Sequence, residues 1–325
     1  MTKVKDVAGI DISKEYFDVC WLSDGQQQEK TFSNDAKGVQ AMTDWLKKDV
    51  HCVLEVTGAY YMRLALHLHR SGFKLSVVNP LVIKRFSQMR LIRAKTDKAD
   101  ARMIAQYGLS EELECWNPPA QYVVTLTQLD NISVQLQKHH TALNNQLESF
   151  AEGGMLEKET RQFLMKLLKS VQQKQLQIEK KIDAIITSYH SEMLQQLTSI
   201  PGLGKKTAAI LIVITDGFEK FNSYKQLSAF VGICPRIFES GKTVKGRGRI
   251  CKMGMSRIRT LLYLCSWSAK KYNKACKELY ERLVAKGKVK RLALIAVANK
   301  LLKQAFAIAK AKQFYKPDYQ KNICL

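Results

Sequence analysis

Residues 7–13, V-A-G-I-D-I-S, form a short apolar run that carries one acid, Asp11. A second run at 52–58, C-V-L-E-V-T-G, repeats the pattern with Glu55. Runs of this length and composition predict buried β-strands, in which an isolated charge is costly unless it is paired or binds a metal. Since sites in open α/β sheets gather at strand ends, the two acids indicate a site at one edge of a sheet.

The segments around these runs predict the rest of the domain. Residues 15–23 alternate apolar and polar side chains, Asp24-Gly25 is typical of a turn, and residues 29–33 predict a third strand. Further along, helical spacing over 35–48 and 59–71 alternates with strand-like runs. Strands first in a meander and then alternating with helices predict an α/β domain with a mixed central sheet.

A further pair of acids, Asp97 and Asp100, comes from K-T-D-K-A-D at 95–100. Their spacing puts both on one face of a helix, where they could join Asp11 and Glu55. Carboxylates of this kind hold two Mg²⁺ ions in enzymes that cut phosphodiesters. The alternative is a plain helix start, with Asp97 beside the helix dipole and Asp100 in solvent.

The character of the chain changes near W-N-P-P-A at 116–120, where two prolines favour a linker. We therefore predict a first domain over 1–115, a linker and helical hairpin over 116–196, and a mostly helical domain over 197–325. The hairpin is expected because 121–150 and 156–196 have apolar residues at three- and four-residue steps around A-E-G-G. It would be a coiled-coil arm or an oligomerisation element.

Residues 197–212, L-T-S-I-P-G-L-G-K-K-T-A-A-I-L-I, are similar to a helix-hairpin-helix. In such a motif the N–H groups at the start of the second helix hold a DNA phosphate without reading the base. Gly202, Gly204, Lys205 and Lys206 are accordingly predicted to contact nucleic acid. The alternative is an ordinary corner between two helices.

A Gly-rich basic loop over 239–252 has Ser240 at its head. A serine among cations could attack a phosphate, because the cations would stabilise the developing charge. From composition alone a phosphate-contacting hydroxyl or a turn residue is the stronger interpretation, since no adjacent histidine could act as the base. The basic residues predicted to contact nucleic acid are Lys242, Lys245, Arg247, Arg249 and Lys252.

The charge of the chain favours a polyanionic partner, most simply nucleic acid. The 325 residues have a net charge of +23, and 22 Lys and Arg against three acids in 241–325 supply +19 of it. We expect no apolar stretch that reaches the roughly 18 residues of a spanning helix, and therefore no membrane partner. There is no secretory signal, and the eight cysteines form no C-x-x-C pair, which favours a reducing, cytoplasmic compartment.

Several motifs in this order resemble the DEDD transposases of the Piv-invertase-like insertion sequences, the bridge-RNA-guided recombinases. They are G-I-D-I-S-K at 9–14, L-E-V-T-G at 54–58, K-T-D-K-A-D-A at 95–101, the I-P-G-L-G turn at 200–204, and S-G at 240–241. The resemblance covers nearly the whole chain.

The resemblance implies a RuvC-like (RNase H fold) N-terminal domain whose Asp11, Glu55, Asp97 and Asp100 bind Mg²⁺. It also implies that Ser240 is a nucleophile that forms a covalent phosphoserine link to DNA. A structured noncoding guide RNA would pair with donor and target DNA, and dimers would assemble into a tetramer, with the serine acting beside the acidic site of another protomer.

We therefore expect an insertion-sequence transposase or site-specific recombinase that acts on double-stranded DNA near the bacterial nucleoid. One alternative is a hydrolytic RuvC-like endonuclease of the Holliday-junction resolvase type. The other is a non-catalytic nucleic-acid-binding protein, which would leave Glu55 unexplained.

Overall fold

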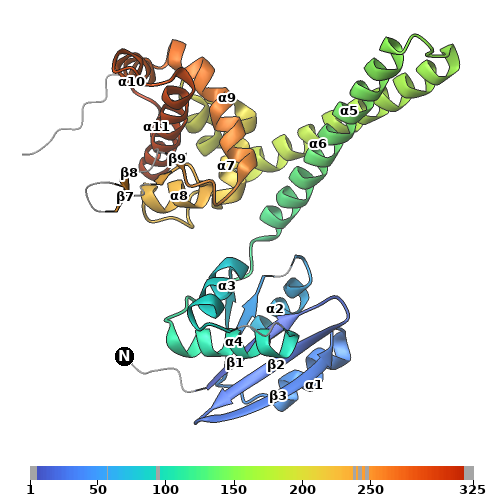
Figure 1. Cartoon of the computed structure of the whole chain (residues 1–325), viewed down its shortest axis with the longest axis vertical. Helices are drawn as coiled ribbons and strands as arrows, with labels where there is room; N and C mark the ends of the chain where they lie inside the picture. The colour runs from blue at the N-terminus through green and yellow to red at the C-terminus, as the bar shows by residue number, and fades with distance from the viewer. Residues whose placement is uncertain are drawn as a thin grey trace, which may run out of the picture. The chain divides into compact units, whose positions relative to one another are not determined.

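The computed structural model describes residues 6–56, 58–92, 96–236 and 249–317, together with the backbone of 239–240 and 244–245. The chain divides into two compact units, Met1–Pro119 and Ala120–Leu325 (Figure 1). The two helices expected at 121–150 and 156–196 therefore fall within the second unit, together with the C-terminal helices.

The first unit is built on a five-stranded sheet with the order β3-β2-β1-β4-β5. Its strands are β1 (Asp6–Ile12), β2 (Tyr16–Ser23), β3 (Gln26–Ser33), β4 (His51–Glu55) and β5 (Lys74–Val78). The first three form an antiparallel meander, and β4 and β5 run parallel to β1. The mixed α/β sheet that the sequence predicts is confirmed.

Helices cover both faces of this sheet (Figure 1). They are α1 (Ala36–Trp45), α2 (Tyr61–Arg70), α3 (Pro80–Met89) and α4 (Asp97–Ser110). Apolar residues of α1 and α2 form one core with β1, β2 and β4, and those of α3 and α4 form a separate core on the opposite face. This division assigns each strand residue to a face.

Local sequence explains where these elements begin and turn. The β2–β3 turn has positive φ at both Asp24 and Gly25, the conformation that a tight two-residue hairpin requires. Asp35, Asn79 and Thr96 cap α1, α3 and α4, because each side chain accepts a hydrogen bond from a backbone N–H of the first turn.

Two long helices open the second unit, α5 (Gln121–Glu152) and α6 (Lys158–Thr198). They lie side by side as a hairpin (Figure 1). The helix α6 bends at His190, whose φ of −141° and ψ of 35° are not helical. The His190 ring lies 3.0 Å from the Tyr122 hydroxyl of α5, so the bend is held by a contact across the hairpin.

The helical core of the second unit follows the hairpin. It consists of α7 (Lys205–Thr215), α8 (Tyr224–Val231), α9 (Ser256–Tyr272), α10 (Lys274–Ala285) and α11 (Lys290–Ala311). Buried apolar residues of these helices and of the base of α6 form one continuous core. The mostly helical C-terminal part that the sequence predicts is confirmed.

The expectation that no apolar stretch is long enough to span a membrane is wrong for one helix, α11. By length and composition alone α11 passes that test, although 44% of its apolar window is buried inside the protein. Eight residues of α11, including Leu294, Leu301 and Ala305, belong to the buried set. The apolar character of α11 is therefore explained by packing against α6, α8, α9 and α10.

Between α8 and α9 the chain forms two short antiparallel ladders. The outer ladder pairs β6 (Pro235–Arg236) with β9 (Arg249–Ile250), and the inner one pairs β7 (Glu239–Ser240) with β8 (Val244–Lys245). The predicted basic loop is thus a narrow β-ribbon in the residues that the structure describes.

Candidate active site and nucleic-acid interface

Strand alternation puts Asp11 and Glu55 on the same face of the sheet. Val7 of β1 and Val53 of β4 pack in the core on the α3–α4 side. Because side chains repeat every two residues, Asp11 and Glu55 face that side as well. Ile10 pairs with Leu54 in the parallel β1–β4 ladder, so the two acids follow at neighbouring carboxyl ends.

The helix α4 supplies the other two acids to this face. Asp97 is the first residue of α4, and Asp100 follows three residues later, also in the first turn of the helix. The helix backbone touches β1 at Gly9, where a Cβ atom would lie 2.1 Å from the Ala105 nitrogen. Only a residue without a side chain permits this contact, which brings the first turn of α4 toward Asp11.

Burial, followed in order by the negative charges of Asp100, Glu55 and Asp97, raises the pKa of the Asp11 carboxyl to about 6. The four acids therefore act on one another electrostatically. Within 6–56, 58–92 and the other described ranges, however, no three His, Cys, Asp or Glu side chains are close enough to hold one metal ion. The raised pKa of Asp11 and the separation of the side chains are both expected of like charges that no cation bridges.

The chemistry of these donors fits a divalent cation. All four are carboxylates, the oxygen ligands that Mg²⁺ and related hard cations prefer. A bound cation would favour their ionised forms and reverse the upward shift of the Asp11 pKa. The first unit thus has carboxylate donors of the kind that suit a divalent cation.

Two residues near this site were not predicted from the sequence. The Tyr16 hydroxyl donates a hydrogen bond to Asp97 Oδ2 at 3.1 Å, and that bond raises the pKa of Tyr16. Asp18 lies opposite Asp11 in the register of the β1–β2 ladder. It is buried and accepts a hydrogen bond from Thr31 Oγ1 at 2.5 Å. Alternation in 15–23 was the available signal, because it places Tyr16 and Asp18 on one face of β2.

The turn before α7 has the backbone expected of a tight helix–helix connection. Gly202 has a φ of +97°, and a Cβ there would lie 2.6 Å from Ala269 of α9, so this glycine serves the turn and the packing. Gly204 precedes α7 and has open space around its Cα. No side chain caps α7 in the described structure, which leaves its first N–H groups for another acceptor.

The two lysines of this turn have acidic partners within the protein. Lys205 Nζ lies 2.8 Å from Asp183 Oδ2, and Lys206 Nζ lies 2.9 Å from Glu179 Oε1. Hydrogen bonds from Gln175 and Lys206 lower the pKa of Glu179. The lysines are about half exposed, so these ion pairs contribute only about 0–1 kcal/mol each and phosphates could replace the acids.

The basic ribbon is described only in part. Ser240 pairs with Val244 through the backbone of β7 and β8, with three residues of the sequence between them, while its side chain lies outside the described residues. Lys242 and Arg247 also lie outside them, and Lys245 is described through its backbone alone. The remaining two basic residues of this set, Arg249 and Lys252, are exposed at the base of the ribbon.

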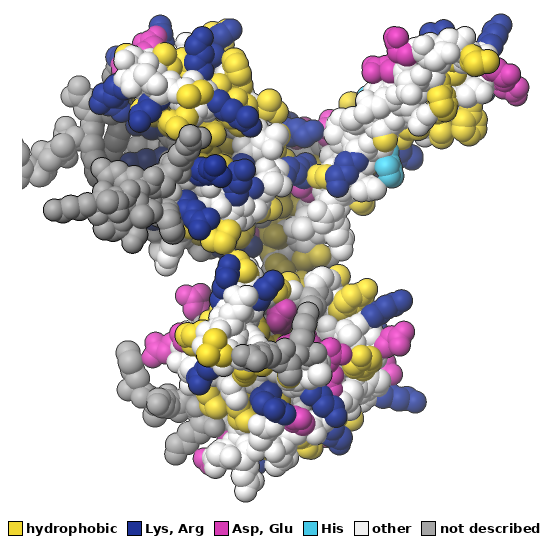
Figure 2. Space-filling model, viewed as in Figure 1, with side chains coloured by type: hydrophobic (Ala, Val, Ile, Leu, Met, Phe, Trp, Pro, Cys, Tyr) yellow, Lys and Arg dark blue, Asp and Glu magenta, His cyan; other side chains and the backbone are white. Residues whose placement is uncertain are grey.

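Basic side chains dominate the visible face of the helical core in the second unit, whereas acids and bases are mixed on the first unit (Figure 2). The helix α9 contains four Lys and Arg residues and no acid. The carboxylates of the candidate active site and the basic surface therefore belong to different units.

Comparison with known proteins identifies the class. A transposase model of the DEDD type matches residues 8–155, and a model described as transposase IS116/IS110/IS902 family matches residues 194–281. The pilin gene-inverting proteins of Moraxella bovis and Moraxella lacunata are each 31% identical over 319 residues, which covers 94% of this chain and 95% of theirs. The transposase for insertion sequence element IS1111A of Coxiella burnetii is 22% identical over 95% of this chain and 91% of its own.

These matches define an enzyme of DNA recombination, with a DEDD-type domain that in general uses divalent metal. The chain belongs to the IS110 family of transposases. The family resemblance found in the sequence motifs is thereby confirmed.

Proposed function

We propose that this transposase cuts and rejoins DNA through a covalent phosphoserine at Ser240, with two Mg²⁺ ions bound by Asp11, Glu55, Asp97 and Asp100. The placement of Asp11 and Glu55 at neighbouring carboxyl ends of β1 and β4, on the face that α4 covers, is the observation that supports the proposal best. The raised pKa of Asp11 agrees with it, because three other carboxylates contribute to that shift. The topology of the sheet is compatible with a RuvC-like, RNase H type domain.

The chemistry at Ser240 would be transesterification. The serine hydroxyl loses its proton as its oxygen attacks the scissile phosphorus, and a new O–P bond forms. The bond from phosphorus to one DNA oxygen breaks, and that oxygen takes up a proton and leaves as a free hydroxyl. A hydroxyl of the joining strand then attacks the same phosphorus and releases the serine. The phosphodiester energy is conserved, so no nucleotide cofactor is required. Divalent cations held by the four carboxylates would stabilise the charge that develops on the phosphate.

Nucleic-acid binding would use the basic second unit. The phosphates of donor and target DNA duplexes would be contacted by four exposed basic side chains, those of Lys205, Lys206, Arg249 and Lys252. A structured guide RNA would supply much of the sequence choice by base pairing, while the protein holds helical backbones. The +19 of residues 241–325 supports a partner of this charge density.

Oligomerisation would use the hairpin as a coiled coil. Three apolar side chains of the hairpin, Met155 in its connection and Phe163 and Leu176 on α6, are 90%, 64% and 58% exposed. Burying such side chains between protomers is favourable. We propose a dimer that assembles into a tetramer, in which Ser240 acts beside the acidic site of another protomer.

The serine mechanism is tested with end-labelled donor DNA incubated with the protein and Mg²⁺ and then run on a denaturing gel. The wild type is expected to give a protein–DNA adduct that protease removes. Ser240→Ala should abolish this adduct. Ser268→Ala, which changes an exposed serine of α9, is the matched control and should retain it.

The main alternative is hydrolysis by the first unit alone, as in a Holliday-junction resolvase. It requires the carboxylates but not the serine. Nicked DNA without an adduct, together with cutting by Ser240→Ala at the wild-type rate, would favour hydrolysis and reject the phosphoserine.

A further inference from the structure

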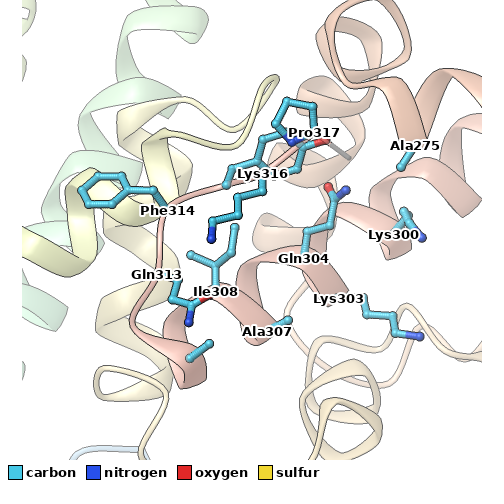
Figure 3. A pocket seen from close by; sticks show the side chains of 12 residues that line it. Ala275, Lys300, Lys303, Gln304, Ala307, Ile308, Gln313, Phe314, Lys316 and Pro317 are labelled. Atoms are coloured by element: carbon cyan, nitrogen blue, oxygen red, sulfur yellow. The ribbon is translucent and has the colours of Figure 1, made fainter. Parts of the chain in front are cut away.

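A cavity of about 370 Å³ lies in the second unit between α11, the start of α10 and the segment 313–317 (Figure 3). Its volume falls within the range of about 300–1,000 Å³ that is typical of small-ligand sites. All of its lining residues come from the second unit, whereas the carboxylates of the candidate active site belong to the first.

Buried hydrogen bonds fix one wall of this cavity. The Tyr315 backbone N–H donates to Ser199 Oγ at 2.9 Å, and the Tyr315 hydroxyl donates to Asn273 Oδ1 at 3.1 Å. Asn273 is fully buried and also donates to Gln304 Oε1 at 3.0 Å. The segment 313–317 is therefore anchored to two separate parts of the fold, at Ser199 and Asn273, and the cavity is a formed feature of the unit.

The lining combines positive charge with an apolar floor. Lys300, Lys303 and Lys316 line the cavity, and none of its described lining residues is acidic. Figure 3 shows Lys316 extending from the segment 313–317 toward Ile308, while Lys300 and Lys303 lie on the opposite side. Most of the remaining lining is apolar, and the small side chains of alanines such as Ala307 leave room between the lysines.

Gln304 adds a polar group that can distinguish ligands. A primary amide has two N–H donors and two acceptor lone pairs, so its bonds to Asn273 leave part of this capacity unused. A ligand that suits the whole cavity has a flat apolar body, polar atoms along one edge, and at least one negative charge. A nucleotide has all three properties.

We propose that this cavity binds one nucleotide unit, with the base against the floor at Ala307 and the phosphate between Lys300 and Lys316. An unpaired nucleotide of a DNA strand and a free nucleotide share this chemistry. The first source rests on the proposed function, because cutting and rejoining strands exposes unpaired bases. The second does not depend on it.

The test uses the full-length protein and two probes. One is a short single-stranded DNA that carries the fluorescent base 2-aminopurine, and the other is deoxyadenosine monophosphate followed by calorimetry. Ala307→Phe fills the cavity from an exposed position, and Lys300→Gln with Lys316→Gln removes two charges. Ala307→Phe is expected to weaken binding by about tenfold, because its ring occupies the space of the base. The double substitution should weaken binding by a similar factor, because it removes contacts to the phosphate.

Lys310→Gln is the matched control, since it removes an exposed charge of α11 that does not line the cavity. It should bind within about twofold of wild type, because the nonspecific effect of one charge is small. If Ala307→Phe weakens binding of the oligonucleotide, the cavity is assigned to DNA. If Ala307→Phe weakens binding of the mononucleotide alone, the cavity is assigned to a free nucleotide.

Unchanged titrations of both probes with Ala307→Phe would overturn the inference. The same measurements are made with Ser240→Ala, which leaves the cavity intact. If the wild type forms the DNA adduct but neither probe binds the cavity, only this inference fails. If the probes bind and no adduct forms, only the serine mechanism fails.

Discussion

Asp11 is the residue on which the candidate site depends. It lies at the end of the central strand β1, burial is the largest cause of its raised pKa, and three acids add to it. Without a cation, ionised Asp11 is thus less favourable in the folded state than in the unfolded one. A cation would reverse this effect, so protonation and metal binding compete at the same carboxyl group.

This competition predicts how stability depends on pH. The folded pKa of about 6 exceeds the ordinary value of 3.8, so the contribution of Asp11 to stability is largest below about pH 4. It is lost as the pH rises through 6. In EDTA at pH 7.5, Asp11→Asn should therefore be more stable than wild type, on the order of 1–2 kcal/mol after allowance for solvent screening.

Urea unfolding at pH 4 and pH 7.5 measures this difference. The gap between Asp11→Asn and wild type should close at pH 4 in EDTA, and it should narrow at pH 7.5 when Mg²⁺ is added. A gap of equal size at both pH values would show that the carboxyl group does not titrate as described.

Tyr16 is expected to position Asp97 rather than to react. Tyr16→Phe removes the 3.1 Å hydrogen bond to Asp97 Oδ2 and leaves the ring in place. Loss of such a bond to a metal ligand costs about tenfold or more in metal affinity or activity. The Mg²⁺ concentration for half-maximal cutting should rise, whereas the exposed control Tyr60→Phe should leave it unchanged.

At the scale of elements, the contact of β1 with α4 decides where half of the acids lie. Gly9→Ala would place a methyl group 2.1 Å from Ala105 N and 2.3 Å from Ala101 O, both backbone atoms. The helix must then move, at a cost of about 1–3 kcal/mol or more. Cutting should fall more than stability alone explains, because Asp97 and Asp100 move with α4.

Gly153→Ala is the matched control for this substitution, since its Cβ would meet only ordinary contacts at 3.5 Å. Thermal unfolding and DNA cutting are measured for both variants. A Gly9→Ala protein with wild-type stability and cutting would show that the close approach of α4 is not needed.

The ion pairs at the start of α7 predict a gain of DNA binding. Replacing both acids, with Glu179→Gln and Asp183→Asn, frees Lys206 and Lys205 from their partners on α6. If the lysines contact phosphates, affinity for duplex DNA should rise, and the slope of log K against log salt should steepen by roughly 2. The pair Glu157→Gln and Glu159→Gln, at the far end of α6, controls for net charge. Equal effects of both pairs would assign no special role to these lysines.

The strands and helices of the first unit could be predicted because one local signal suffices. Apolar runs mark β1 and β4, alternation marks β2, and α1, α3 and α4 start at capping residues, so neighbours in the sequence carry the information. The placement of Asp11 and Glu55 at strand ends follows from the same signal.

The contacts between distant segments could not be predicted in this way. The Tyr16–Asp97 bond joins residues 81 apart, and the ion pairs of Lys205 and Lys206 depend on the angle between α6 and α7. The apolar length of α11 was also missed, because its lysines interrupt the run in sequence while its buried face is continuous. Such features depend on how elements meet.

At the scale of the whole molecule, the hairpin predicts concentration-dependent association. Phe163→Glu with Leu176→Glu puts charges on exposed apolar positions of α6 without touching its buried residues Leu164 and Leu168. Sedimentation should shift toward smaller species, because burying a charge in an interface is costly. The control Gln173→Glu adds a charge at an exposed polar position of the same helix and should leave the distribution unchanged. Identical sedimentation of all three proteins would assign assembly to another surface.

The bend at His190 divides α6 into a long part that belongs to the hairpin and a short C-terminal part that packs among the other helices. A continuous rod transmits torque along its whole length, whereas a rod with a break in its hydrogen-bond ladder yields there first. We expect a load on the long part of this helix to bend it at His190, where the contact between the His190 ring and the Tyr122 hydroxyl of α5 resists the movement.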